Sequence, residues 1–187
     1  MKKKILIIIG LLVVLVVIGG VVILKGQNQS EKLNPENPSP LQSPNQVNKL
    51  ESVTNVCDTF SKEKISQFLG KEITKSEVAT NKVNPEPSCY YYIGTKTVYL
   101  ELDRNADINE QINGWKALDS TVKEESQIPL KNFVVYTQEG NVRRIYLVIG
   151  EKSFLTIDNW GLGLSKEEEL SFASKLAEYL KSEFGVK

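Results

Sequence analysis

Residues 133–157 read FVVYTQEGNVRRIYLVIGEKSFLTI, and this stretch decides the expected fold class. It contains three runs rich in β-branched and aromatic residues: Phe133–Thr137, Val142–Ile149 and Phe154–Ile157. Polar turns that contain glycine separate them, at Glu139-Gly140-Asn141 and Gly150-Glu151-Lys152. Hairpins have this pattern, and their strands pair antiparallel. The stretch therefore predicts a three-stranded antiparallel meander.

A second group of strands is predicted upstream of the meander. Cys89–Ile93 and Thr97–Leu102 are aromatic and β-branched runs, and Gly94-Thr95-Lys96 joins them as a hairpin turn. A weaker strand pattern covers Glu72–Val78. The chain therefore carries two groups of three predicted strands.

Three predicted helices flank these groups. The first has Ser61 as its N-cap and stops at Gly70. In Asp107–Val122, apolar residues recur along one helical face: Ile108, Ile112, Trp115, Leu118 and Val122. The last helix opens with a capping box, Ser165 to Glu168, and its apolar stripe is Leu170, Ala173, Leu176, Ala177 and Leu180. The order α-βββ-α-βββ-α predicts an α+β sandwich over residues 53–187, with helices covering an antiparallel sheet.

Residues Ile5–Leu24 are twenty consecutive apolar or glycine positions. As a helix they extend roughly 30 Å, the hydrocarbon thickness of a bilayer, and so predict one transmembrane signal anchor. A cleaved signal peptide is the alternative, although its apolar run is shorter and ends in a small-residue cleavage motif. Lys2, Lys3 and Lys4 precede the run, and a single Lys25 follows it. The positive-inside rule therefore places residues 1–4 in the cytoplasm and the C-terminal domain outside.

Residues 25–52 have the composition of a linker. They contain Pro35, Pro38, Pro40 and Pro44 among Asn, Gln, Ser and Glu, and no aromatic residue precedes Phe60. Such a segment buries too little apolar surface to offset the entropy of ordering it. We expect a flexible spacer between the anchor and the domain.

The composition excludes several kinds of chemistry. The chain has no histidine, which removes Ser-His-Asp and Cys-His mechanisms and every histidine-ligated metal site. Two cysteines cannot form a tetrahedral thiolate site. After residue 25 the chain holds 19 basic and 23 acidic residues, which gives no reason to expect nucleic acid as a partner. We expect no enzyme activity, no metal and no cofactor.

Cys57 and Cys89 lie in the part predicted to be outside the cell, where disulfides persist. A bridge between them would stabilise the domain by about 3.7 kcal/mol in the chain-entropy model. A redox-active pair is the alternative, but such pairs usually have close spacing such as Cys-x-x-Cys. The sequence favours a structural disulfide.

Cys57-Asp-Thr-Phe-Ser61, the helix ending Phe68-Leu69-Gly70, and Cys89 followed by tyrosines resemble the cysteine framework of secreted bacterial lipoprotein-like domains. The resemblance covers roughly residues 57–183. It implies a PsbP-like fold and an extracytoplasmic setting, and it brings no catalytic residues. This chain differs from the group because it has a predicted transmembrane anchor instead of a lipidated cysteine.

A candidate ligand-binding segment lies between the last strand and the last helix. It consists of Asp158, Asn159 and Trp160, followed by the glycine-bearing residues 161–163. A tryptophan beside a carboxylate can stack against a sugar or a peptide. The alternative is a structural loop in which Trp160 closes one end of the core.

Three further groups of residues have both a functional and a structural interpretation. Asp103, Asn105 and Asp107 match the start of a calcium loop, but Ile108 stands where that loop needs glycine, so Asp107 is better interpreted as a helix N-cap. Glu101 and Asp103 share one face of a strand and could serve as an acid/base pair only inside a cleft. Tyr90, Tyr91 and Tyr92 must alternate between the two faces, as must any strand residues.

We expect a non-catalytic extracytoplasmic domain that binds a protein, a peptide or a wall polymer beside the membrane. The alternatives are a carrier of an apolar small molecule, held between sheet and helix, and a carboxylate-based hydrolase. A well-formed apolar cavity of a few hundred Å³ would favour the carrier. A flat face rich in tyrosine would favour the binding domain.

Overall fold

The computed structural model describes residues 47–79, 86–160 and 162–187, except for the side chains of Val47, Asn48, Asn159 and Trp160. The described residues all belong to one compact unit of the chain, Gln42–Lys187. The predicted transmembrane helix and most of the predicted linker lie outside the described residues. Within the described ranges, no helix has the length and apolar character needed to cross a membrane.

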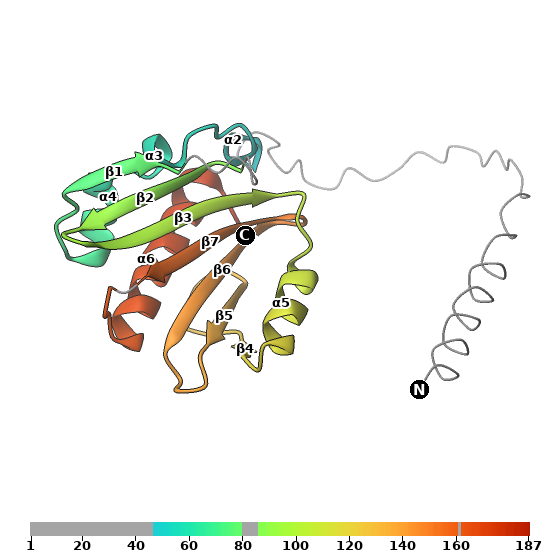
Figure 1. Ribbon diagram of the computed structural model, residues 1–187. Coiled ribbons are helices and arrows are strands. Elements are labelled where there is room, and N and C mark those ends of the chain that lie inside the picture. The colour runs from blue at the N-terminus through green and yellow to red at the C-terminus, as the bar shows by residue number, and fades with distance from the viewer. Residues whose placement is uncertain (1–46, 80–85, 161) are drawn as a thin grey trace, which may run out of the picture. The chain divides into compact units, whose positions relative to one another are not determined.

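The domain is built on one antiparallel sheet in the order β1-β2-β3-β7-β6-β5-β4 (Figure 1). Its strands are β1 (Lys75–Val78), β2 (Ser88–Ile93), β3 (Lys96–Arg104), β4 (Thr121–Lys123), β5 (Asn132–Tyr136), β6 (Val142–Gly150) and β7 (Ser153–Trp160). The predicted α+β class and antiparallel sheet are confirmed. The sheet has seven strands, one more than the sequence predicts.

The predicted turns join the strands as expected. Gly140 between β5 and β6 has φ 83°, and Gly94 between β2 and β3 has φ 62°. Both values lie in the left-handed region that glycine adopts without steric cost. The β5-β6-β7 meander is therefore confirmed, and β7 closes it against β3 at the centre of the sheet.

Five helices are described: α2 (Val47–Glu51), α3 (Val56–Thr59), α4 (Lys62–Leu69), α5 (Ile108–Ala117) and α6 (Lys166–Phe184). The predicted N-cap Ser61 is confirmed, and Gly70 ends α4 with φ 67°. The predicted capping box of Ser165 and Glu168 opens α6. Helix α2 lies inside the segment predicted as a linker, and its Leu50 is only 4% exposed, so the folded domain begins before residue 53.

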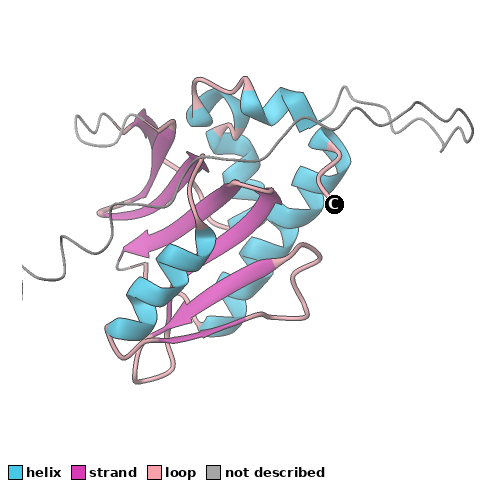
Figure 2. Ribbon diagram, turned by 90° about the vertical axis from the view of Figure 1, so that its right-hand side faces the viewer, coloured by secondary structure: helices cyan, strands magenta, loops and turns pink. Residues whose placement is uncertain are grey.

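The two faces of the sheet are covered unequally. The main core packs one face against α3, α4 and α6 through Phe60, Ile65, Leu170, Leu176 and Leu180. On the opposite face, α5 covers a smaller cluster of Val135, Tyr146 and Phe154 (Figure 2). Successive strand residues point to opposite faces, which is why Ile145 and Leu147 join the main core while Tyr146 joins the smaller cluster.

The predicted disulfide joins Cys57 of α3 to Cys89 of β2, with their Cα atoms 5.2 Å apart. It fastens the N-terminal helices to the sheet. The side chain of Tyr91, on the same strand, donates a hydrogen bond of 2.6 Å to the carbonyl oxygen of Phe60. Two residues on the same face of β2, Cys89 and Tyr91, therefore hold the segment that contains α3.

The helix predicted over Asp107–Val122 is wrong in its last turn. Helix α5 ends at Ala117, Asp119 has φ 57°, and Val122 lies in β4. A left-handed residue ends an α-helix because the chain leaves the helical path there. Leu118, predicted to be buried, is 67% exposed as a result.

Candidate functional site

The segment predicted to bind ligand is part of a strand. Asp158, Asn159 and Trp160 are the last residues of β7, and their Cα partners in β3 are Tyr99, Val98 and Thr97. The prediction of a loop at these positions is therefore wrong. Asp158 is 6% exposed. The side chains of Asn159 and Trp160 lie outside the description, so both residues stay sequence-based candidates.

Asp158 belongs to a larger surface, the sheet face opposite α6, which we call the open face. Cross-strand partners point to the same side, and the register aligns Glu77, Tyr90, Tyr99, Asp158 and Arg144 across five strands. The next rows of the register add Lys75, Tyr92, Ser88, Glu101, Thr156 and Asp103. Among the described residues, α5 is the helix that packs on this face, and it covers Tyr146 and Phe154 at one end.

Tyrosine rings form one part of the open face. The ring centroids of Tyr90 and Tyr99 are 4.9 Å apart, and those of Tyr90 and Tyr92 are 6.5 Å apart. Tyr90 is 38% exposed. Burial raises the pKa of Tyr99 to about 12, so this phenol is neutral at physiological pH. The prediction that these tyrosines alternate between faces is confirmed, because Tyr91 is fully buried on the other side.

Carboxylates form the second part. The hydroxyl of Thr156 donates a hydrogen bond of 2.6 Å to Asp103. Burial raises the pKa of Asp103 to about 6, and repulsion from Glu101 and Glu86 acts in the same direction. Burial also raises the pKa of Glu101, which is further raised by Glu86 and Asp158 and lowered by its hydrogen bond with Tyr99. These carboxylates are thus close enough to repel one another.

An ion pair closes the end of the face towards α5. The Nε atom of Arg144 donates to Oδ2 of Asp158 at 3.0 Å, and Nη2 donates to the same oxygen. The Arg144 guanidinium also lies 5.2 Å from the centroid of the Trp115 ring. Trp115 in turn donates a hydrogen bond of 2.7 Å to the hydroxyl of Tyr146. Asp158 is therefore paired with an arginine that itself packs against the Trp115 ring.

The sequence did not identify Arg144 or Thr156 as part of a site. The sequence does contain a signal for Arg144 and Thr156, because both are polar residues inside apolar strand runs. The strand period places each of them on the face opposite the main core. Which partners they meet depends on the register with β3 and β7, which local patterns do not contain.

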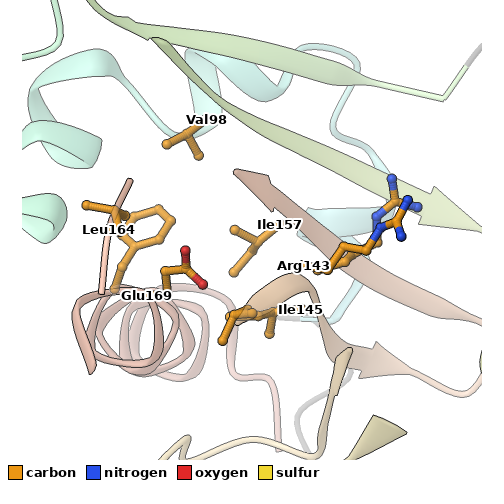
Figure 3. A pocket seen from close by; sticks show the side chains of 9 residues that line it. Val98, Arg143, Ile145, Ile157, Leu164 and Glu169 are labelled. Atoms are coloured by element: carbon orange, nitrogen blue, oxygen red, sulfur yellow. The ribbon is translucent and has the colours of Figure 1, made fainter. Parts of the chain in front are cut away.

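The space between sheet and helix, where a carrier would hold its ligand, is nearly filled. The hollow there is lined by Val98, Ile145, Ile157, Leu164 and Glu169, among others, and its cavity volume is about 10 Å³ (Figure 3). That volume holds about one water molecule at most. A larger hollow of about 310 Å³ lies outside the core, beside residues 105–109, and its lining includes Asp107, Glu151 and Lys152.

No group of three or more Asp, Glu or Cys side chains within the described ranges is arranged to hold a metal ion. The candidate residues of the open face are tyrosine rings, carboxylates and one arginine, groups that can form ring–cation contacts and charge-assisted hydrogen bonds.

Comparisons with known proteins assign no relative: no family model matches the chain, and no curated protein or solved structure matches it. The resemblance to lipoprotein-like domains stays a prediction.

Proposed function

We propose that this chain is a single-pass membrane protein of the cell surface whose extracytoplasmic domain is a non-catalytic binding module. Its ligand is a protein, a peptide or a wall polymer, and it binds at the open face. The finer fold assignment, a PsbP-like sandwich, is part of the same proposal.

The observation that carries the proposal is the unequal covering of the sheet. Helices α3, α4 and α6 pack on one face, and the residues buried between them and the sheet form the main core. On the other face, the described residues leave Tyr90 substantially exposed beside two further tyrosine rings. Tyrosine is enriched at the centres of protein interfaces because its ring is large, rigid and able to hydrogen-bond.

Two other features support the extracytoplasmic setting. The apolar run Ile5–Leu24 and the lysines before it have the pattern of a signal anchor. The Cys57–Cys89 disulfide is of the kind that persists in oxidising compartments. The proline-rich segment after the anchor would hold the domain away from the membrane.

The alternatives rank lower. A carrier of an apolar molecule needs an apolar pocket of roughly 300–1,000 Å³, and the hollow between sheet and α6 measures about 10 Å³. The hollow of about 310 Å³ beside residues 105–109 is lined mainly by polar and charged residues, which do not suit an apolar ligand. A carboxylate-based hydrolase needs two carboxylates on opposite sides of a bound substrate. Glu101 and Asp103 instead lie on the same side of the same strand.

Site-specific photocrosslinking in native cells tests this proposal. A benzophenone amino acid replaces Tyr90 in the full-length chain, and a matched variant carries it in place of Leu118, which is exposed but lies at the end of α5. We expect a discrete crosslinked product from position 90 and none of the same mass from position 118. Equal products from both positions, or none from position 90, would refute a recognition role for the open face.

A further inference from the structure

Strand β1 (Lys75–Val78) forms one edge of the sheet and pairs with β2 (Figure 1). At its end, the amide of Ala79 donates a hydrogen bond of 3.1 Å to the carbonyl oxygen of Ser88. In an antiparallel pair, every second residue exchanges such bonds with the neighbouring strand. By this alternation, the backbone N–H and C=O groups of Ser76 and Val78 point away from β2. The outer side of β1 therefore presents backbone donors and acceptors that fit a further strand.

The side chains along this edge are exposed and carry both signs of charge. Lys75 and Glu77 are both exposed, and the Nζ atom of Lys75 lies 2.6 Å from Oε2 of Glu77. Val78 is 46% exposed, although it is a large apolar residue in a strand. Charged residues on an edge strand often prevent pairing with other chains. Whether they prevent it here depends on which charges they would meet in a partner strand.

A second copy of β1 meets the first with opposite charges aligned. A two-fold axis perpendicular to the sheet, through Ser76, places the two Ser76 residues opposite each other, where they exchange backbone hydrogen bonds. Lys75 of each copy then lies opposite Glu77 of the other, and Val78 lies opposite Thr74 of the other. Opposite charges at such cross-strand positions attract. The edge is therefore complementary to itself.

The neighbouring registers are less favourable. An axis through Glu77 would set the two Glu77 carboxylates directly opposite each other, and an axis through Lys75 would do the same with two ammonium groups. Like charges at directly opposite positions are destabilising. The charges of β1 thus favour the register centred on Ser76.

We propose that two copies of this chain pair through their β1 strands, antiparallel and centred on Ser76, and so join their sheets into one. The axis perpendicular to the sheet keeps both open faces on the same side of the joined sheet. This inference does not depend on the ligand of the open face, because it concerns a different part of the surface, the edge of the sheet.

Co-purification of two differently tagged full-length copies, expressed together and extracted in mild detergent, tests the inference. The variants, made in both copies, are Lys75→Glu, Glu77→Lys and the double exchange of both. The matched controls are Lys116→Glu and Glu178→Lys, which reverse the charge of exposed residues on α5 and α6. Melting curves check that each variant folds.

We expect the unmodified copies to capture each other. Each single reversal should lower the captured fraction about tenfold, because two attracting cross-strand pairs become two repelling ones. The double exchange should restore capture, since acids again oppose bases. Expression of one copy with Lys75→Glu beside another with Glu77→Lys should restore it for the same reason. Both control variants should be captured like the unmodified chain.

Three outcomes would overturn the inference. Capture that persists in the single reversals would mean that the copies associate through another surface. No capture between unmodified copies would mean that the charges of β1 protect the edge from pairing. Failure of the double exchange to restore capture, in a protein that melts like the unmodified chain, would exclude the register centred on Ser76.

Discussion

The surroundings of Asp103 disfavour its ionised form. The carboxylate is partly buried on β3, accepts a hydrogen bond from Thr156, and is repelled by Glu101 and Glu86. Because its pKa in the folded domain is raised to about 6, the folded state binds a proton that the unfolded chain releases at lower pH. The carboxyl of Asp103 therefore makes its full contribution to the free energy of unfolding below the ordinary pKa of an aspartate. That contribution is lost as the pH rises through 6.

Asp103→Asn should remove this decrease in folding stability with rising pH. The amide oxygen of asparagine still accepts the hydrogen bond from Thr156, but the residue no longer ionises. At pH 7 we expect the variant to be more stable by on the order of 1–2 kcal/mol, after allowing for solvent screening. Urea unfolding at pH 4.5 and pH 7 measures the effect. A difference between variant and wild type that is the same at both pH values would contradict this explanation.

At the scale of elements, β2 fixes the N-terminal helices. Cys89 holds α3 through the disulfide, and Tyr91 holds the following residue, Phe60, by a hydrogen bond. The ring of Phe60 then packs edge-on against Tyr179 of α6, with the centroids 6.0 Å apart. One strand thus aligns α3 with the helix that covers the main core.

Replacing both cysteines should loosen this end of the domain. For Cys57→Ala with Cys89→Ala we expect a loss of roughly 2–4 kcal/mol in the free energy of unfolding, because the unfolded chain regains the freedom of the closed loop. Denaturant unfolding measures the loss. Wild type under reducing conditions should lose a similar amount. An unchanged midpoint in both samples would mean that the hydrogen bond and core packing hold α3 without the bridge.

The whole molecule combines a predicted anchor with a domain whose open face we propose as a binding surface. The orientation of that domain is tested in intact cells by single cysteines. A membrane-impermeant thiol reagent should label Ser43→Cys and should not label Lys3→Cys, because the positive-inside rule, applied to the lysines before Ile5–Leu24, predicts a cytoplasmic N-terminus. The native cysteines are bridged and give no background. The reverse labelling would overturn the topology.

Local sequence patterns determined much of the domain. Alternating apolar runs and glycine turns predicted β5, β6 and β7, and the caps at Ser61 and Ser165 predicted where α4 and α6 begin. These features depend on interactions between residues a few positions apart, so a short window of sequence contains them. The end of α5 was predicted wrongly because the apolar spacing continues to Val122, although the backbone turns left-handed at Asp119.

Only the tertiary structure decided where the candidate site lies. Asp158 meets Arg144 and Tyr99 because β7 inserts between β6 and β3, and Thr156 meets Asp103 across 53 positions of the chain. Strand order and register are set by how all the apolar faces pack together, and a shift of one residue would turn every side chain of a strand to the other face. The sequence by itself determined which residues alternate along each strand; the packed sheet decided which of them became neighbours.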